Sequence, residues 1–267
     1  MKNAMLFILL SGMALYAGPQ DTIDEKSEAK SMGTASKIMT KDIAYSAGGK
    51  TFIGYLAWDA SRADRRPGIL VVHEWLGLNE YAKRRARDLA AEGYAAFALD
   101  MYGDGKAIPM SEARGMSGKV GSDFPLIKER FNAALAVLKS QPFVDGNNLA
   151  AIGYCFGGGI VLNMARMGTT IKGVVSFHGS INTGLTAKPG DIVTKILAYQ
   201  GDGDPAAPEE KRNAFIAEMD SSGADYEYVV FDNVKAHNFT NPDGSSYYEK
   251  ESRLAWDGMI AFFNGLF

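Results

Sequence analysis

Cysteine and histidine are both scarce in this sequence. Cys155 is the only cysteine, so no internal disulfide holds the chain together. The three histidines do not group with cysteines or carboxylates at the spacing of metal ligands. We therefore predict no metal site and no other cofactor.

The sequence also lacks any concentration of charge of one sign. Its formal net charge is −3, with acidic and basic residues spread along the chain, which argues against a nucleic-acid surface. The chain has 267 residues, of which 46% are hydrophobic, enough to bury one large core. This composition favours small-molecule chemistry and leaves the oligomeric state open.

No apolar run reaches the roughly 20 residues that are needed to cross a bilayer. Lys2, the apolar run 4–16 and then Ala17-Gly18-Pro19 have the three-part form of a secretory signal peptide. We predict export to the periplasm or the medium without a stable membrane anchor. The expected organisation is a signal peptide over 1–17, a flexible leader over 18–37 and a folded domain over 38–267.

Strands and helices are predicted to alternate through the folded domain. Two alternating stretches flank Gly48-Gly49 and predict a β-hairpin over 38–59. Segment 100–123 has no sustained periodicity, and we expect an irregular lid there. The alternation predicts a single α/β domain with a mostly parallel sheet and helices on both faces. Expected strands are 69–72, 94–99, 149–152, 171–177, 196–200 and 226–231; expected helices are 79–92, 127–138, 160–167, one containing Phe215 and Met219, and 246–263.

Cys155 stands between glycines, after an apolar run and before a helical pattern. This is the pattern of a nucleophile elbow, in which Gly153 and Gly157 lack the side chains that would collide in a sharp strand-to-helix turn. The turn is expected to point the N–H of Phe156 at the carbonyl group under attack, and the positive end of the helix favours a thiolate. The alternative is a buried, inert cysteine beside a glycine-rich turn.

A cysteine hydrolase needs a base and an acid that orients it. His237 follows the last predicted strand, where an α/β hydrolase carries its base. Asp202 and Asp204 follow the preceding strand, and both are candidates for the acid. With either aspartate the chain order is nucleophile, acid and base, which is the order of the α/β hydrolases.

Taken together, the motifs resemble the dienelactone hydrolase family over residues 38–267. The resemblance implies the α/β-hydrolase fold and a triad of Cys155, Asp204 and His237, which leaves Asp202 as a turn residue. It also implies that Glu74 takes part in switching the thiol to a thiolate, and that the backbone N–H groups of Trp75 and Phe156 form the oxyanion hole. The motifs are His73-Glu74-Trp75-Leu76-Gly77, Gly153-Tyr154-Cys155-Phe156-Gly157-Gly158, Gly201-Asp202-Gly203-Asp204-Pro205-Ala206-Ala207-Pro208 and His237-Asn238-Phe239.

One position departs from the family pattern. An arginine that helps to hold the substrate carboxylate lies four residues beyond the catalytic histidine in the family, and here that position is Asn241. A neutral amide makes no ion pair, although Arg114 lies near a second family arginine. We consider His73, Tyr102 and His178 as further candidates for the pocket wall, with a hydrogen-bonded residue at a strand end as the alternative for both histidines.

The expected function is hydrolysis of a small-molecule carboxylic ester or lactone through a thioester on Cys155. One alternative is a carboxylesterase that acts on neutral esters. Another is a non-catalytic exported protein that keeps the fold and uses its thiol for binding or redox response.

Overall fold

The computed structural model describes residues 36–267, which form one compact unit. The predicted signal peptide, and the predicted leader up to residue 35, lie outside the described residues. The compact unit is built on one eight-stranded sheet. Its strands are β1 (Ile38–Ala47), β2 (Lys50–Asp59), β3 (Arg66–Val72), β4 (Ala95–Leu99), β5 (Val144–Tyr154), β6 (Gly173–Phe177), β7 (Lys195–Gly201) and β8 (Tyr226–Phe231).

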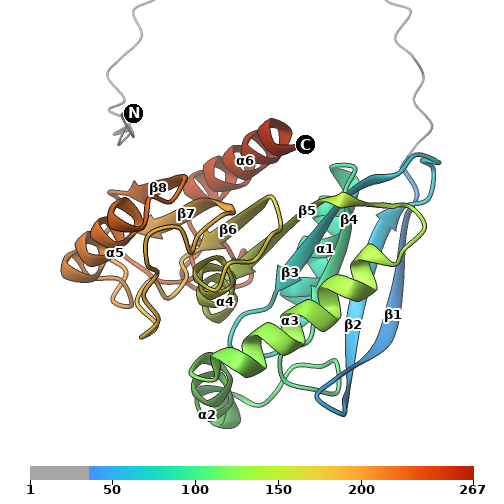
Figure 1. Ribbon diagram of the computed structural model, residues 1–267, viewed down its shortest axis with the longest axis horizontal. Helices are drawn as coiled ribbons and strands as arrows, with labels where there is room; N and C mark the ends of the chain where they lie inside the picture. The colour runs from blue at the N-terminus through green and yellow to red at the C-terminus, as the bar shows by residue number, and fades with distance from the viewer. Residues whose placement is uncertain (1–35) are drawn as a thin grey trace, which may run out of the picture. The chain divides into compact units, whose positions relative to one another are not determined.

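The sheet order is β1-β2-β4-β3-β5-β6-β7-β8 (Figure 1). The pairs β1/β2 and β2/β4 are antiparallel, and every pair from β4 to β8 is parallel. The predicted hairpin is therefore present as β1 and β2, joined by Gly48 and Gly49 at φ 55° and 72°. Glycine adopts these positive angles without strain, which explains the pair at this turn.

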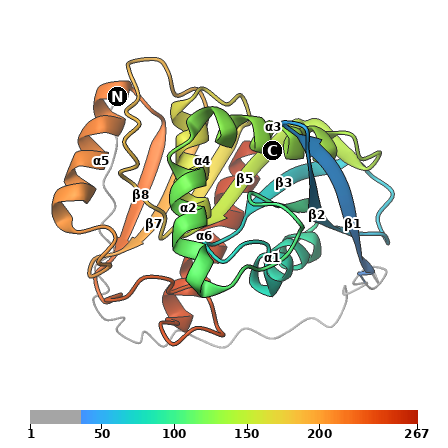
Figure 2. The ribbon, with the colours of Figure 1, turned by 90° about the horizontal axis from the view of Figure 1, so that it is seen from below.

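Helices cover both faces of the sheet (Figure 2). One core cluster joins α1 and α6 to the sheet, and a second joins α3, α4 and α5 to its other face. The predicted mostly parallel α/β fold is confirmed. The helices are α1 (Glu80–Ala91), α2 (Met110–Gly121), α3 (Phe124–Lys139), α4 (Phe156–Arg166), α5 (Glu209–Ser222) and α6 (Glu249–Leu266).

The prediction of an irregular segment over 100–123 is wrong for its second half, which forms α2. Only Ala113 and Val120 of α2 are buried, so its apolar stripe is too sparse to show in the sequence. The turn before α2 is held by Asp100, whose carboxylate accepts the N–H groups of Gly103 and Gly105 at 2.9 Å each.

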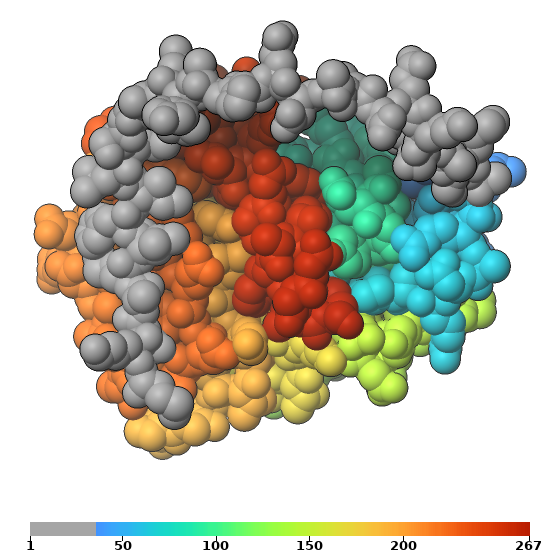
Figure 3. All heavy atoms as spheres, turned by 90° about the horizontal axis from the view of Figure 1, so that it is seen from above, coloured from blue at the N-terminus to red at the C-terminus, as the bar shows by residue number. Residues whose placement is uncertain are grey.

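The C-terminal helix α6 lies beside α1, as Figure 3 shows for one face of the molecule. Trp256 of α6 donates its indole N–H to Glu92, which caps α1, at 3.4 Å. Its ring also lies 5.1 Å from the guanidinium carbon of Arg85. Among the described residues, no helix combines the length and the apolar character needed to cross a membrane.

Candidate active site

The carboxyl ends of the parallel strands bring the predicted catalytic residues to one edge of the sheet. Glu74 follows β3, Cys155 follows β5, Asp204 follows β7 and His237 follows β8. Parallel strands all end at the same edge, and this is where open α/β sheets bind ligands. Residues far apart in the chain therefore meet there.

The turn at Cys155 is a strained strand-to-helix elbow. Cys155 has φ 54° and ψ −114°, and the next residue begins α4. A Cβ on Gly153 would lie 2.1 Å from the carbonyl oxygen of Gly157, and a Cβ on Gly157 would lie 2.3 Å from that of Val72. Both glycines are therefore required by close backbone contacts, as the sequence pattern predicts.

Cys155, His237 and Asp204 form a continuous hydrogen-bonded chain. His237 Nε2 lies 3.0 Å from Cys155 Sγ, and His237 Nδ1 lies 2.7 Å from Asp204 Oδ2. The Asp204 carboxylate is buried and accepts the Ala206 N–H at 2.8 Å and the Gln200 amide at 2.5 Å. With Nδ1–H donating to Asp204, Nε2 faces the sulfur and is placed to take its proton.

The contacts of His237 change its pKa. Burial lowers the pKa, but the hydrogen bonds to Asp204 and Cys155 outweigh this effect and raise it to about 10. A protonated imidazole is thus stabilised between the two partners, as a base needs once it has accepted a proton.

Trp75 and Phe156 are the two residues that the resemblance assigns to the oxyanion hole. Phe156 is the first residue of α4, so its N–H has no acceptor within the helix. Trp75 lies in the turn after β3, and its carbonyl oxygen accepts the Tyr102 hydroxyl at 3.0 Å. Both Trp75 and Phe156 line the same cavity as Cys155. That their N–H groups form the oxyanion hole stays a prediction from the resemblance.

Glu74 is a buried carboxyl group that is 4% exposed. Burial raises its pKa from the ordinary 4.5 to about 7, and the positive charges of His237 and Arg85 only partly oppose this. A proton is thus held on Glu74 into the neutral range. The side chain is a titratable group within electrostatic range of the proposed base.

Replacing Glu74 with glutamine is expected to change how stability depends on pH. Between pH 4.5 and about 7 the unfolded chain releases this proton while the folded protein keeps it, so ionisation opposes folding as pH rises. The Glu74→Gln variant lacks this penalty. Its free energy of unfolding relative to that of wild type should therefore rise by up to about 3 kcal/mol between pH 5 and pH 8. Urea unfolding at both pH values measures the difference. The exposed Glu112→Gln control should differ from wild type by the same free energy of unfolding at both pH values. The same result for Glu74→Gln would contradict the prediction.

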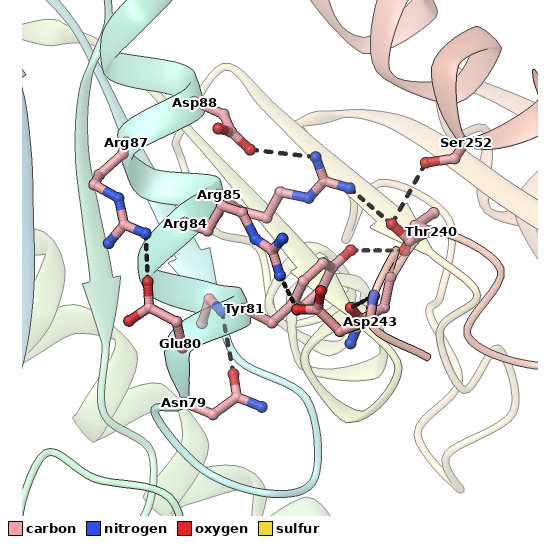
Figure 4. Close-up of polar contacts among 12 residues, drawn as sticks. Asn79, Glu80, Tyr81, Arg84, Arg85, Arg87, Asp88, Thr240, Asp243 and Ser252 are labelled. Atoms are coloured by element: carbon pink, nitrogen blue, oxygen red, sulfur yellow. Dashed lines mark hydrogen bonds and ion pairs between the residues drawn. The ribbon is translucent and has the colours of Figure 1, made fainter. Parts of the chain in front are cut away.

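The segment after His237 is anchored to α1 by a buried polar network (Figure 4). Thr240 Oγ1 lies 2.8 Å from both the Tyr81 hydroxyl and His178 Nε2. The Thr240 carbonyl oxygen accepts Arg85 Nη2 at 2.8 Å. The position of His237 therefore depends on α1 as well as on β8.

The residues considered for the pocket wall differ in their placement. Arg114 of α2 lines the cavity. His73 and His178 are fully buried instead, with burial as the main cause of their lowered pKa values, and His73 Nε2 accepts the Met101 N–H at 3.1 Å. Tyr102 donates its hydroxyl to the Trp75 carbonyl oxygen, and the Asn241 side-chain oxygen accepts the N–H of Asp243 at 3.1 Å. These four lie outside the cavity lining because their side chains serve neighbouring loops or the interior.

The cavity beside Cys155 has a volume of about 540 Å³. Its lining includes Arg114, Ser117, Gly118 and Gly121 of α2 and several residues of α4. Ser180, Asn182 and Thr183, which follow β6, line it as well. Sequence reasoning missed Asn163 on α4, whose only sequence signal is an amide within an otherwise apolar helix.

The sheet order, the strand-to-helix elbow and the chain order of Cys155, Asp204 and His237 define the protein as an α/β hydrolase. The chain belongs to the dienelactone hydrolase family, whose model matches residues 52–267. No group of three or more histidine, cysteine or acidic residues in the described part of the chain is placed to hold a metal ion.

Known proteins of this family resemble the chain over most of its length. A dienelactone hydrolase-like promiscuous phosphotriesterase from metagenomic libraries is 33% identical, with a TM-score of 0.79, and covers 86% of this chain and 99% of its own. A putative carboxymethylenebutenolidase of Salmonella typhimurium is 28% identical over 247 residues, covering 85% of this chain and 90% of the relative. A probable 2-oxo-3-(5-oxofuran-2-ylidene)propanoate lactonase of Bradyrhizobium is 26% identical over 225 residues, covering 80% and 89%.

Proposed function

We propose that the protein is an exported hydrolase of small carboxylic esters or lactones that uses Cys155, His237 and Asp204 as its catalytic triad. The main support is the unbroken contact chain from Sγ through the imidazole to a buried carboxylate, at 3.0 and 2.7 Å. The names of the lactonase and carboxymethylenebutenolidase relatives agree with this substrate class.

In the proposed reaction, the thiol proton moves to His237 Nε2, whose pKa of about 10 favours the charged form, and the thiolate Sγ then bonds to the substrate carbonyl carbon. The carbonyl oxygen becomes an oxyanion that accepts hydrogen bonds from the Trp75 and Phe156 N–H groups, each worth about 3 kcal/mol in comparable sites. Collapse breaks the ester C–O bond, and His237 returns the proton to the leaving oxygen. Water then attacks the thioester with His237 as base, releasing the acid and the thiol.

Neutral esters form a second candidate substrate class. Asn241, where the family has an arginine, is uncharged and lies outside the cavity lining, which leaves Arg114 as the one arginine or lysine that lines the cavity among the described residues. Glu74, between β3 and the oxyanion donor Trp75, is proposed to exchange a proton with the site when substrate binds. Its pKa of about 7 supports this role.

The test is steady-state hydrolysis of a carboxylate-bearing dienelactone, a neutral lactone, aryl esters and a phosphotriester, followed by acid quench and mass spectrometry. We expect turnover of a carboxylic ester or lactone and an acyl adduct on Cys155. Turnover without an acyl adduct on Cys155 would contradict the assignment of Cys155 as the nucleophile. Failure to hydrolyse any of the esters or lactones would contradict the hydrolase and favour the binding or redox role. Secretion of the full chain, with loss of residues 1–17, tests export.

A further inference from the structure

The cavity extends from the nucleophile along the surface of α4. Cys155, Gly159 and Asn163 line it at four-residue spacing, which places them on one face of the helix. At a rise of 1.5 Å per residue, Asn163 lies about 12 Å along the helix axis from Cys155. Phe156 and Ile160 also line it, so the side chains that α4 adds between Cys155 and Asn163 are apolar.

The orientation of the Asn163 amide is set by its neighbours. Its Oδ1 accepts Arg166 Nη1 at 3.3 Å and the Thr183 hydroxyl at 2.5 Å. Arg166 is itself fixed by two contacts of 2.8 Å with the Glu218 carboxylate. Because a guanidinium can only donate hydrogen bonds, the amide oxygen must face Arg166 and the amide nitrogen must face away from it.

The amide nitrogen of Asn163 has no acceptor among the described residues, although the residue is only 1% exposed. The nitrogen is not among the fully buried side-chain atoms that lack a partner, so it keeps a small contact with the space around it. The small exposed part of Asn163 faces the cavity that Cys155 also lines. The donor is therefore available to a molecule in that cavity.

We propose that Asn163 forms a second subsite, which binds an oxygen acceptor at the far end of an extended ester substrate. The matching substrate has an apolar arm that lies over Ile160 and ends in an ether, carbonyl or carboxylate oxygen. This inference rests on the proposed function, because the other end of the substrate is attacked by Cys155. It deepens that function by defining the arm beyond the scissile bond.

The experiment compares kcat/KM for aryl octanoate, its ω-methoxy counterpart and the aryl monoester of suberate, with aryl acetate as the short reference. Octyl acetate and ω-methoxyoctyl acetate test an arm on the alcohol side. On the acyl or the alcohol side, wild type should have a kcat/KM about tenfold higher for the ester whose arm ends in oxygen than for the plain octanoate or octyl acetate. One hydrogen bond accounts for a difference of this size. Equal kcat/KM values for the oxygen-tipped and plain esters on both the acyl and the alcohol side would overturn the subsite, even if aryl acetate is hydrolysed rapidly. No hydrolysis of any ester would instead count against the proposed function.

Asn163→Asp is the informative variant, since Oδ1 keeps its contacts with Arg166 and Thr183 while the free donor becomes an acceptor. It should abolish the preference for the methoxy arm and disfavour the suberate arm. The readout is a ratio between long esters, so a general change in activity cancels. The matched control is Asn213→Asp on the exposed face of α5, which should keep the preference. An Asn163→Asp protein that retains the wild-type ratio would overturn the assignment, and the wild-type ratio decides alone if this variant does not fold.

Discussion

Replacing Cys155 with alanine should lower kcat/KM at least about 10⁴-fold for every carboxylic ester or lactone that the protein hydrolyses. Loss of a triad nucleophile removes the covalent route, and only binding and the oxyanion donors remain. The Sγ atom is the only group that His237 Nε2 contacts at hydrogen-bond distance among the described residues. The same steady-state assays measure the effect.

The alanine variant should fold like wild type. Alanine and cysteine are both strained at φ 54°, so the elbow geometry costs about the same in either protein. Thermal unfolding of both proteins checks this. A folded alanine variant that retains activity within tenfold would show that Cys155 is not the nucleophile.

Replacing Asp204 with asparagine should lower kcat by about 10³- to 10⁴-fold, as loss of the orienting carboxylate does in other triads. Asp204 accepts hydrogen bonds through both oxygens, from His237 and Gln200 at Oδ2 and from Ala206 at Oδ1. An asparagine must turn its NH₂ group toward one of these donors. Either His237 changes tautomer or the turn that carries the acid is disturbed.

Asp202→Asn is the matched control for Asp204→Asn. Asp202 lies two residues earlier, and its partly exposed carboxylate contacts Lys235 Nζ at 2.5 Å instead of His237. The control should keep kcat within a few-fold, because exposed ion pairs contribute little. Comparable losses in both variants would contradict the assignment of Asp204 as the acid.

Sequence patterns alone predict the elbow and the positions of most helices and strands. The glycines on either side of Cys155 are required by close backbone contacts in the turn, so the turn can be predicted from the spacing of glycines in the sequence. The same reasoning does not predict α2, since three glycines lower its intrinsic helix preference and only two of its residues are buried. Packing against α3 and α4 stabilises that helix.

The residues alone could not choose between Asp202 and Asp204, because both follow β7 within a few positions. The choice came from family resemblance, and the structure agrees with it through the contact between Asp204 and His237. His73 and His178 also lie at strand ends near the site. Their direction into the interior depends on Met101 and Thr240, which are distant in the chain.

The sequence by itself determined the alternation of strands and helices, the sharp turn at Cys155 and the chain order of Cys155, the two candidate acids and His237. These features arise from periodicity and sterics over a few residues. Only the tertiary structure decided which acid reaches His237, which side chains line the cavity and which way the Asn163 amide is turned. Those outcomes depend on contacts between β5, β7, β8 and α4, which form only when distant segments pack together.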